Sequence, residues 1–210
     1  MRVDDTYNMN EENSRTHIDK LGPLIRLDLF TDAVFAIIIT LLAIEINLPK
    51  DVNGASLTIE LRHMYPVFLV HIISFTVLAI EWIDHHSMFE HAVKCTRPLI
   101  VANLIFCFTL TTVPFLTKLL GLFPYSRPAV ILYSLGIFLM SAGKELLWQV
   151  ISRQARTHPG GKFKIKYAAV LCVSIISSGV ALIRPIIAVY VWIIFGVISV
   201  ARRLVVRRQK

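Results

Sequence analysis

The chain has 210 residues, of which 55% are hydrophobic, and a mean hydropathy of +0.64. These values exceed the usual balance of a soluble domain and, with Leu, Ile and Val in long runs, predict a polytopic membrane protein. The formal charge of +8 does not indicate nucleic-acid binding. Its basic residues follow apolar segments, where they set topology and contact anionic lipid headgroups.

Residues 1–23 are polar, contain no apolar stretch typical of a signal peptide, and are expected to form a cytoplasmic tail that is mobile in water. The first helix is predicted over about residues 28–48. From Phe30 to Leu48 it would reach roughly 28 Å, close to the thickness of a hydrocarbon core. Asp28 and Asp32 lie four residues apart on one face at its start, and ionisable groups there suggest a role.

Five further apolar segments follow the first helix and complete a six-helix transmembrane domain over residues 24–201. They are expected at about 64–83, 99–117, 129–150, 167–183 and 186–201, before a basic cytoplasmic tail at 202–210. Arg184 and Pro185 divide the last apolar block, which predicts a tight helical hairpin. A hairpin that enters and leaves on one side without crossing is the alternative for that block.

Loop charge predicts the orientation of the chain. Lys and Arg are dense in the N-terminal tail, in the loop with Lys94 and Arg97, in the 153–166 loop and in the C-terminal tail. The other three connections carry few of them. By the positive-inside rule both termini are expected in the cytoplasm, which agrees with an even number of helices.

The three cysteines, Cys95, Cys107 and Cys172, have no repeated spacing. Two lie within apolar segments, so all three are interpreted as small core residues rather than as a disulfide framework or a zinc site.

One stripe of the first helix is apolar apart from a hydroxyl. Steps of three and four residues from Ala33 reach Ile37, Thr40 or Leu41, Ile44 and Leu48. Such a stripe usually contacts lipid or another helix. Alternatively, symmetric copies of the helix around an axis would stack Ile37, Leu41 and Ile44 into apolar rings that gate by excluding water.

The segment RLDLFTDAVFAIIITLLAIEINLP resembles the first-helix signature of the prokaryotic TMEM175 potassium channels. That signature is Arg-x3-Phe-Ser-Asp, an Ala/Ile-rich run, Thr-Leu-Leu and a closing Pro; Thr31 stands where the family usually has Ser. The matching residues are Arg26, Phe30, Thr31, Asp32, Ala36, Ile37, Thr40, Leu41, Leu42 and Pro49. A looser resemblance continues in Trp82, His85, His86 and Phe89 and over residues 103–115.

The resemblance implies an all-α homotetramer in the cell membrane, whose first helices line a pathway for potassium ions. It implies that Ile37 forms the narrowest ring, with Leu41 and Ile44 as the next layers outward, and that Thr40 contributes to potassium preference. An apolar constriction forces partial dehydration, and potassium loses water more easily than sodium, so the selectivity is expected to be modest. Glu45, and beyond it Asp51, would concentrate cations at the outer mouth.

The resemblance also implies a polar network that supports the pore helix at its cytoplasmic end and does not conduct ions. Its expected members are Arg26, Phe30, Thr31, Asp32, His85, His86 and Asn103. The expected partners are potassium ions, membrane lipid and other copies of the chain, and no cofactor is expected.

Two alternatives compete with a channel. His85, His86 and His91 would serve a membrane oxidoreductase, but no two of them are three or four residues apart, the spacing that places metal ligands on one helix face. No nucleophile with its base, phosphate-binding glycine loop or dinucleotide fingerprint occurs in the sequence. The second alternative is a membrane scaffold that conducts nothing.

Overall fold

The computed structural model describes residues 3–47 and 57–155 and scattered residues between 172 and 198, with side chains from Gly22 onward. Within this part every regular element is a helix. In chain order these are α1 (Val3–Ile44), α2 (Leu57–His63), α3 (Tyr65–Phe89), α4 (Arg97–Thr111), α5 (Val113–Leu122) and α6 (Arg127–Gln154).

Four helical stretches of the described residues are long and apolar enough to cross a membrane: Gly22–Ile44, Tyr65–Phe89, Arg97–Leu122 and Arg127–Gln154. The third comprises α4 and α5, which meet at Thr112. The chain is therefore a multi-pass membrane protein. The predicted helices at 167–183 and 186–201 lie largely outside the described residues.

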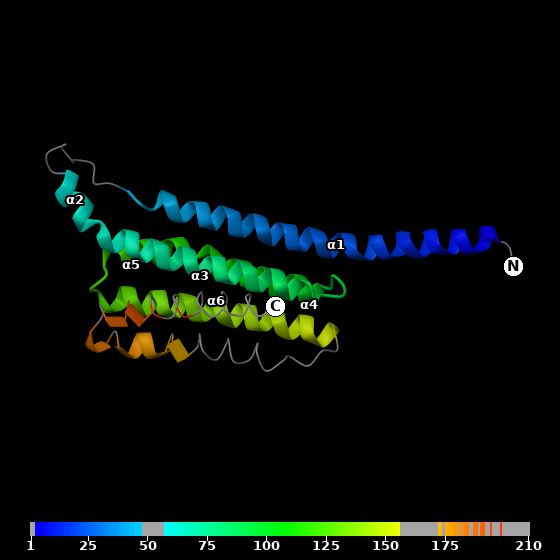
Figure 1. The fold of residues 1–210 in the computed structure, drawn as a ribbon. Coiled ribbons are helices and arrows are strands. Elements are labelled where there is room, and N and C mark those ends of the chain that lie inside the picture. The colour runs from blue at the N-terminus through cyan, green and yellow to red at the C-terminus, as the bar shows by residue number, and fades with distance from the viewer. Residues whose placement is uncertain are drawn as a thin grey trace.

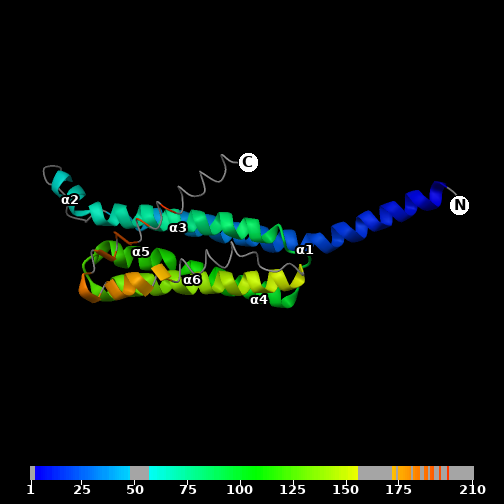
Figure 2. The same ribbon diagram turned by 60° about the horizontal axis from the view of Figure 1, so that its bottom comes forward.

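The polar segment expected as an N-terminal tail is helical from Val3 onward and continuous with the first span. No glycine or proline interrupts the helix before Gly22, and Pro23 lies inside it. In Figures 1 and 2 this N-terminal part of α1 extends well beyond the other helices.

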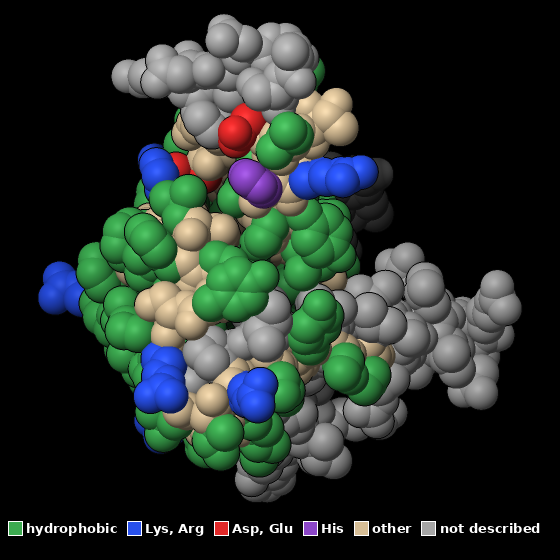
Figure 3. Space-filling model, turned by 90° about the vertical axis from the view of Figure 1, so that its left-hand side faces the viewer, with side chains coloured by type: hydrophobic (Ala, Val, Ile, Leu, Met, Phe, Trp, Pro, Cys, Tyr) green, Lys and Arg blue, Asp and Glu red, His purple; other side chains and the backbone are tan. Residues whose placement is uncertain are grey.

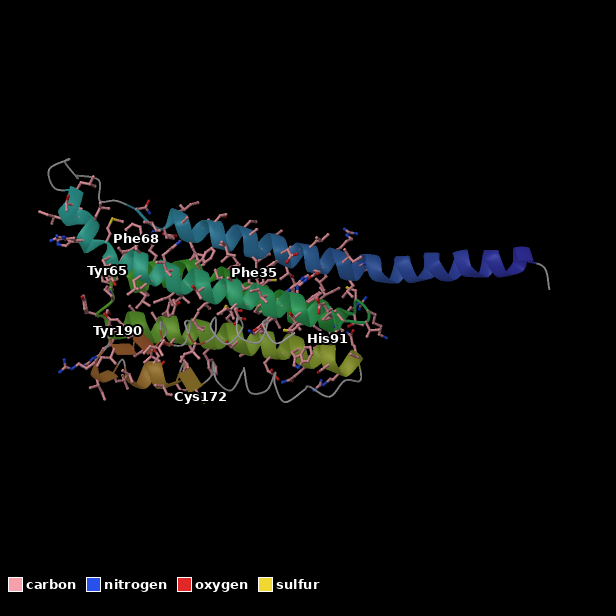
Figure 4. All side chains as sticks on the ribbon, viewed as in Figure 1. Phe35, Tyr65, Phe68, His91, Cys172 and Tyr190 are labelled. Atoms are coloured by element: carbon pink, nitrogen blue, oxygen red, sulfur yellow. The ribbon has the colours of Figure 1, made fainter. Side chains whose placement is uncertain are left out.

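The bundle separates α1 from α6. α1 packs on α3, α4 and α5, and α6 packs on the opposite side of the same three helices (Figure 1). Phe35, which projects from α1 toward α3 in Figure 4, is 1% exposed and contacts Phe106 of α4. The interior is apolar between these helices, with Leu78, Leu110 and Ile137 almost fully buried.

Two glycines allow helices to approach closely. A Cβ atom at Gly143 of α6 would lie 3.3 Å from the Cα atom of Phe106 in α4. One at Gly121 of α5 would lie 3.2 Å from the Cα atom of Val67 in α3. Small residues at such crossings bring backbones together in membrane proteins.

Ser177 connects the C-terminal part to the bundle. The Ser134 hydroxyl of α6 donates to the Ser177 hydroxyl over 3.1 Å, and Ser177 donates to the carbonyl of Ala188 over 3.3 Å. Arg184, between these two residues, is outside any helix. The contact brings together residues on either side of the point where the sequence predicts a hairpin.

The end of the molecule where α2 lies carries charge. All of α2 is accessible, including Glu60, Arg62 and His63. Figure 3 views this end and shows Lys, Arg, acidic and His side chains among hydrophobic ones. Such a mixture suits a segment at a membrane surface, where charged groups reach water.

Candidate functional site

One face of α1 is buried against its own protomer. Phe35, Ile38 and Leu42 are each at most 2% exposed. Their spacing of three and four residues places them on a single side of the helix, which packs on α3 and α4. This contact fixes which side of α1 points away from the bundle.

The opposite face is apolar and exposed. Ile37, Leu41 and Ile44 are 59%, 41% and 65% exposed, so the predicted constriction residues lie together on the free side of the helix. Thr40 is exposed beside them, and its hydroxyl donates to the Ile37 carbonyl over 2.8 Å. In a membrane this face meets either lipid or other protein chains.

α1 ends in a polar group. The Asn47 side-chain amide donates to the carbonyl of Ile44 over 3.1 Å and so satisfies one of the last carbonyls of the helix. Glu45 forms an ion pair with Lys118 of α5, with Oε2 and Nζ 2.6 Å apart. The expected outer-mouth carboxylate is therefore close to a cation from its own protomer. Asp51 lies outside the described residues.

A buried hydrogen-bond network joins α1, α3 and α4. The Asn103 amide nitrogen donates to Thr31 Oγ1 over 2.7 Å, and Asn103 Oδ1 accepts from His85 Nε2 over 3.1 Å. Thr31 in turn donates to the carbonyl of Leu27 over 3.1 Å. Thr31, His85 and Asn103 are each 0% exposed. Three residues expected in the polar network are thus brought together.

Aromatic rings enclose His85. Its ring stacks on Phe106 with centroids 5.8 Å apart and an interplanar angle of 10°, and it lies 4.4 Å from the ring of Phe89. Phe35 closes a third side at 6.1 Å. His85 Nδ1 is 3.8 Å from a carboxylate oxygen of Asp28. The histidine therefore links the start of the first span to α3 and α4.

A second contact between α1 and α3 is more accessible. Trp82 Nε1 donates to Asp32 Oδ1 over 2.8 Å, and the Trp82 ring stacks on His86 with centroids 6.1 Å apart. Arg26 and Phe30, the remaining expected members of the network, are exposed and lie on the same side of α1 as Ile37.

A buried ionic cluster was missed by the sequence interpretation. Lys144 of α6 approaches Glu81 of α3 at 2.5 Å and Asp84 at 3.5 Å, and the three residues are between 3% and 8% exposed. Ionisable residues within a span, on one face of a helix, are the signal that points to such a cluster. Glu81 and Asp84 are three residues apart inside an apolar segment, and Lys144 is likewise inside one.

The histidines do not converge. His91 contacts the Trp148 ring edge-on at 5.8 Å at the far end of α3 (Figure 4), whereas His85 is enclosed and His86 is exposed. Over the described part of the chain, no group of three or more His, Cys, Asp or Glu side chains is arranged to hold a metal ion.

Comparison with known proteins identifies relatives. The sequence model of the family described as "Endosomal/lysosomal potassium channel TMEM175" matches residues 26–114. A potassium channel of Streptomyces collinus is 32% identical over 61% of this chain and 64% of its own length. A potassium channel of Chryseobacterium is 33% identical over 61% of this chain and 65% of its own length. The matches thus span slightly less than two thirds of these relatives.

The fold also matches a solved structure. The crystal structure of a lysosomal potassium-selective channel TMEM175 homolog from Chamaesiphon minutus superposes with a TM-score of 0.77 at 24% identity. The match covers 85% of this chain and 97% of that one, and at this identity it establishes the fold alone. Together with the match over residues 26–114, it confirms the predicted resemblance of this chain to the TMEM175 family.

Proposed function

We propose that the chain is one subunit of a potassium-permeable channel, a homotetramer in the cell membrane whose α1 helices line the pore. Each protomer would contribute six transmembrane helices, and both termini would be cytoplasmic. Support comes from the two bacterial relatives, which are named potassium channels, and from the fold shared with a TMEM175 homolog.

The observation that carries this proposal is the exposed stripe of Ile37, Leu41 and Ile44. α1 uses its other face for its own protomer, so the stripe is available to copies of itself. Four such helices around an axis would form stacked apolar rings, and rings of this kind exclude water unless the helices separate.

Ion discrimination would arise at these rings. A cation that passes an apolar ring loses part of its hydration shell, and potassium loses water at lower cost than sodium. Thr40 lies at the level of the rings, and the free lone pairs of its hydroxyl can replace part of the lost hydration. No cofactor is needed for this process beyond the permeant ion, and the resulting selectivity is modest.

The proposal is tested by potassium and sodium flux through the protein reconstituted in liposomes. Wild type should pass potassium faster than sodium. Ile37→Asn places a polar group in the narrowest ring, which eases wetting, and it should raise the flux of both ions while lowering the potassium-to-sodium ratio. Ile37→Val keeps the ring apolar and is the matched control, which should keep the wild-type ratio.

A wild-type protein that is assembled but passes neither ion contradicts the proposal and favours a scaffold. Stoichiometric haem or metal in the purified protein, seen by absorption spectroscopy and elemental analysis, would favour the oxidoreductase. The relatives are named as channels, not as enzymes, which argues against an oxidoreductase.

A further inference from the structure

The buried cluster of Lys144, Glu81 and Asp84 is the strongest ionic feature that the proposed pore does not use. A charged group inside a membrane span is costly to bury and is seldom kept without a role. The three side chains lie between α3 and α6, and α6 does not pack on the pore helix α1. Any effect of the cluster on α1 must therefore pass through another helix.

α3, α4 and α5 each pack on both α1 and α6, and α3 is the one that supplies the carboxylates paired with Lys144. On α3, Glu81 and Asp84 form ion pairs with Lys144, whereas Trp82 and His85 contact α1. All four occur within little more than one turn. At 3.6 residues per turn the pair facing α6 and the pair facing α1 point in directions about 100° apart.

Because a helical turn is rigid, these two faces cannot rotate independently. If the ion pairs hold the Glu81–Asp84 face toward Lys144, then Trp82 and His85 are held toward Asp32 and Asp28. These contacts lie at the start of the span that carries Ile37. A rotation of α3 would loosen the contacts of Trp82 and His85 with α1 and allow α1 to rotate. Ile37 would then turn away from the pore axis, and residues beside it on α1 would turn toward that axis.

We infer that Lys144 is a positioning residue for the pore helix: through Glu81 and Asp84 it sets the rotation of α3, and α3 sets that of α1. This inference rests on the proposed function, because it assumes that Ile37 faces the pore. It assigns Lys144 an influence on ion discrimination although no ion reaches it.

The test uses a variant that removes the charges together. Lys144→Met alone would remove the Lys144 ammonium from beside two buried carboxylates, which is expected to be strongly destabilising. The triple variant Lys144→Met/Glu81→Gln/Asp84→Asn keeps similar volumes, and neutral replacements of buried ion pairs are often tolerated. The control is Ser141→Ala, one turn away on α6, where the buried hydroxyl has no hydrogen-bond partner among the described residues.

The triple variant should assemble at the wild-type level, and its potassium-to-sodium permeability ratio should change by roughly twofold or more, while Ser141→Ala keeps the ratio. In a Trp82→Phe background, which already lacks the hydrogen bond to Asp32, the additional change should be smaller. This non-additivity between residues on different faces of α3 is not expected from a loss of stability alone.

An assembled triple variant with the wild-type ratio would overturn the inference. Failure of the triple variant to assemble would overturn it as well, because the cluster would then serve folding. An additional change that is as large in the Trp82→Phe background as in wild type would show that the effect bypasses α3. A wild-type protein that passes no potassium would instead refute the proposed function, and this inference with it.

Discussion

Glu45 follows the last turn of α1, where the helix dipole already concentrates negative charge. Lys118 offsets that charge at 2.6 Å, with side-chain exposures of 28% for Glu45 and 45% for Lys118. An ion pair this accessible adds little to stability, roughly 0–1 kcal/mol, because water and salt screen it. In the proposed channel, its larger effect would be on the electrostatic potential that a cation meets near Glu45.

We therefore expect Lys118→Gln to raise potassium conductance at low ionic strength, since Glu45 would then attract cations without compensation. The increase should disappear near 1 M salt, where the screening length falls to about 3 Å. Single-channel recording over a range of potassium concentrations measures both effects.

The matched control for Lys118→Gln is the double variant Glu45→Gln/Lys118→Gln, in which no carboxylate remains to be released. Its conductance at low salt should not exceed that of Glu45→Gln. An equal increase in both backgrounds would mean that Lys118 acts on gating, or repels cations by its own charge, rather than through Glu45.

At the scale of elements, the sequence allowed the free face of α1 to be predicted but not its length. The spacing of Ile37, Leu41 and Ile44 indicates one stripe, and the structure places all three on one exposed side. The helix begins at Val3 because a polar segment without Gly or Pro can continue it into water. Hydropathy does not report such an extension, since it detects only the apolar part.

Contacts between elements were less accessible to sequence reasoning. Asn103, Thr31 and His85 entered the expected network through resemblance alone, and the Lys144 cluster was not identified as a unit. Each of these contacts joins residues from different helices. Which residues pair depends on how each helix is rotated about its own axis. The periodicity of the sequence indicates only which side of a helix is buried, so it does not define that rotation closely enough to predict the pairs.

The close approach of α4 and α6 leads to a prediction at this scale. Gly143→Val would place side-chain atoms against the Phe106 backbone, where even a Cβ atom lies at 3.3 Å. Overpacking of this kind costs about 1–3 kcal/mol. The variant should have a lower midpoint of thermal aggregation in detergent. Gly179→Ala is the control, because no atom of the described residues lies within 4 Å of a Cβ atom there, and an unchanged midpoint for both would disprove the tight crossing.

At the scale of the whole molecule, four spans could be predicted from hydropathy and are present in the described residues. The boundaries still shifted: α3 continues to Phe89, and the third span contains two helices that meet at Thr112. Assembly could be predicted only from resemblance. An apolar stripe has the same composition whether lipid or another protein covers it.

Cross-linking tests the assembly directly. In a background without the three native cysteines, Ile37→Cys should form disulfide-linked dimers under mild oxidation, because four copies of residue 37 would meet at a narrow ring. Ile38→Cys is one residue away but 2% exposed against its own protomer, so it should remain unlinked. Non-reducing electrophoresis separates these outcomes. Linkage at position 38 and none at 37 would place the stripe toward lipid.

The length of α1 has a mechanical consequence. A single rod from Val3 to Ile44 joins the cytoplasmic side, as proposed, to the level of Ile37. Because the backbone hydrogen bonds keep the helix stiff, a small tilt of its polar N-terminal part would displace the C-terminal part, near Ile44, sideways. Pro23 lacks the N–H group that would complete one of those bonds. The helix is therefore expected to bend most easily near Pro23, and in the proposed channel this bending would limit how much of the tilt reaches Ile37.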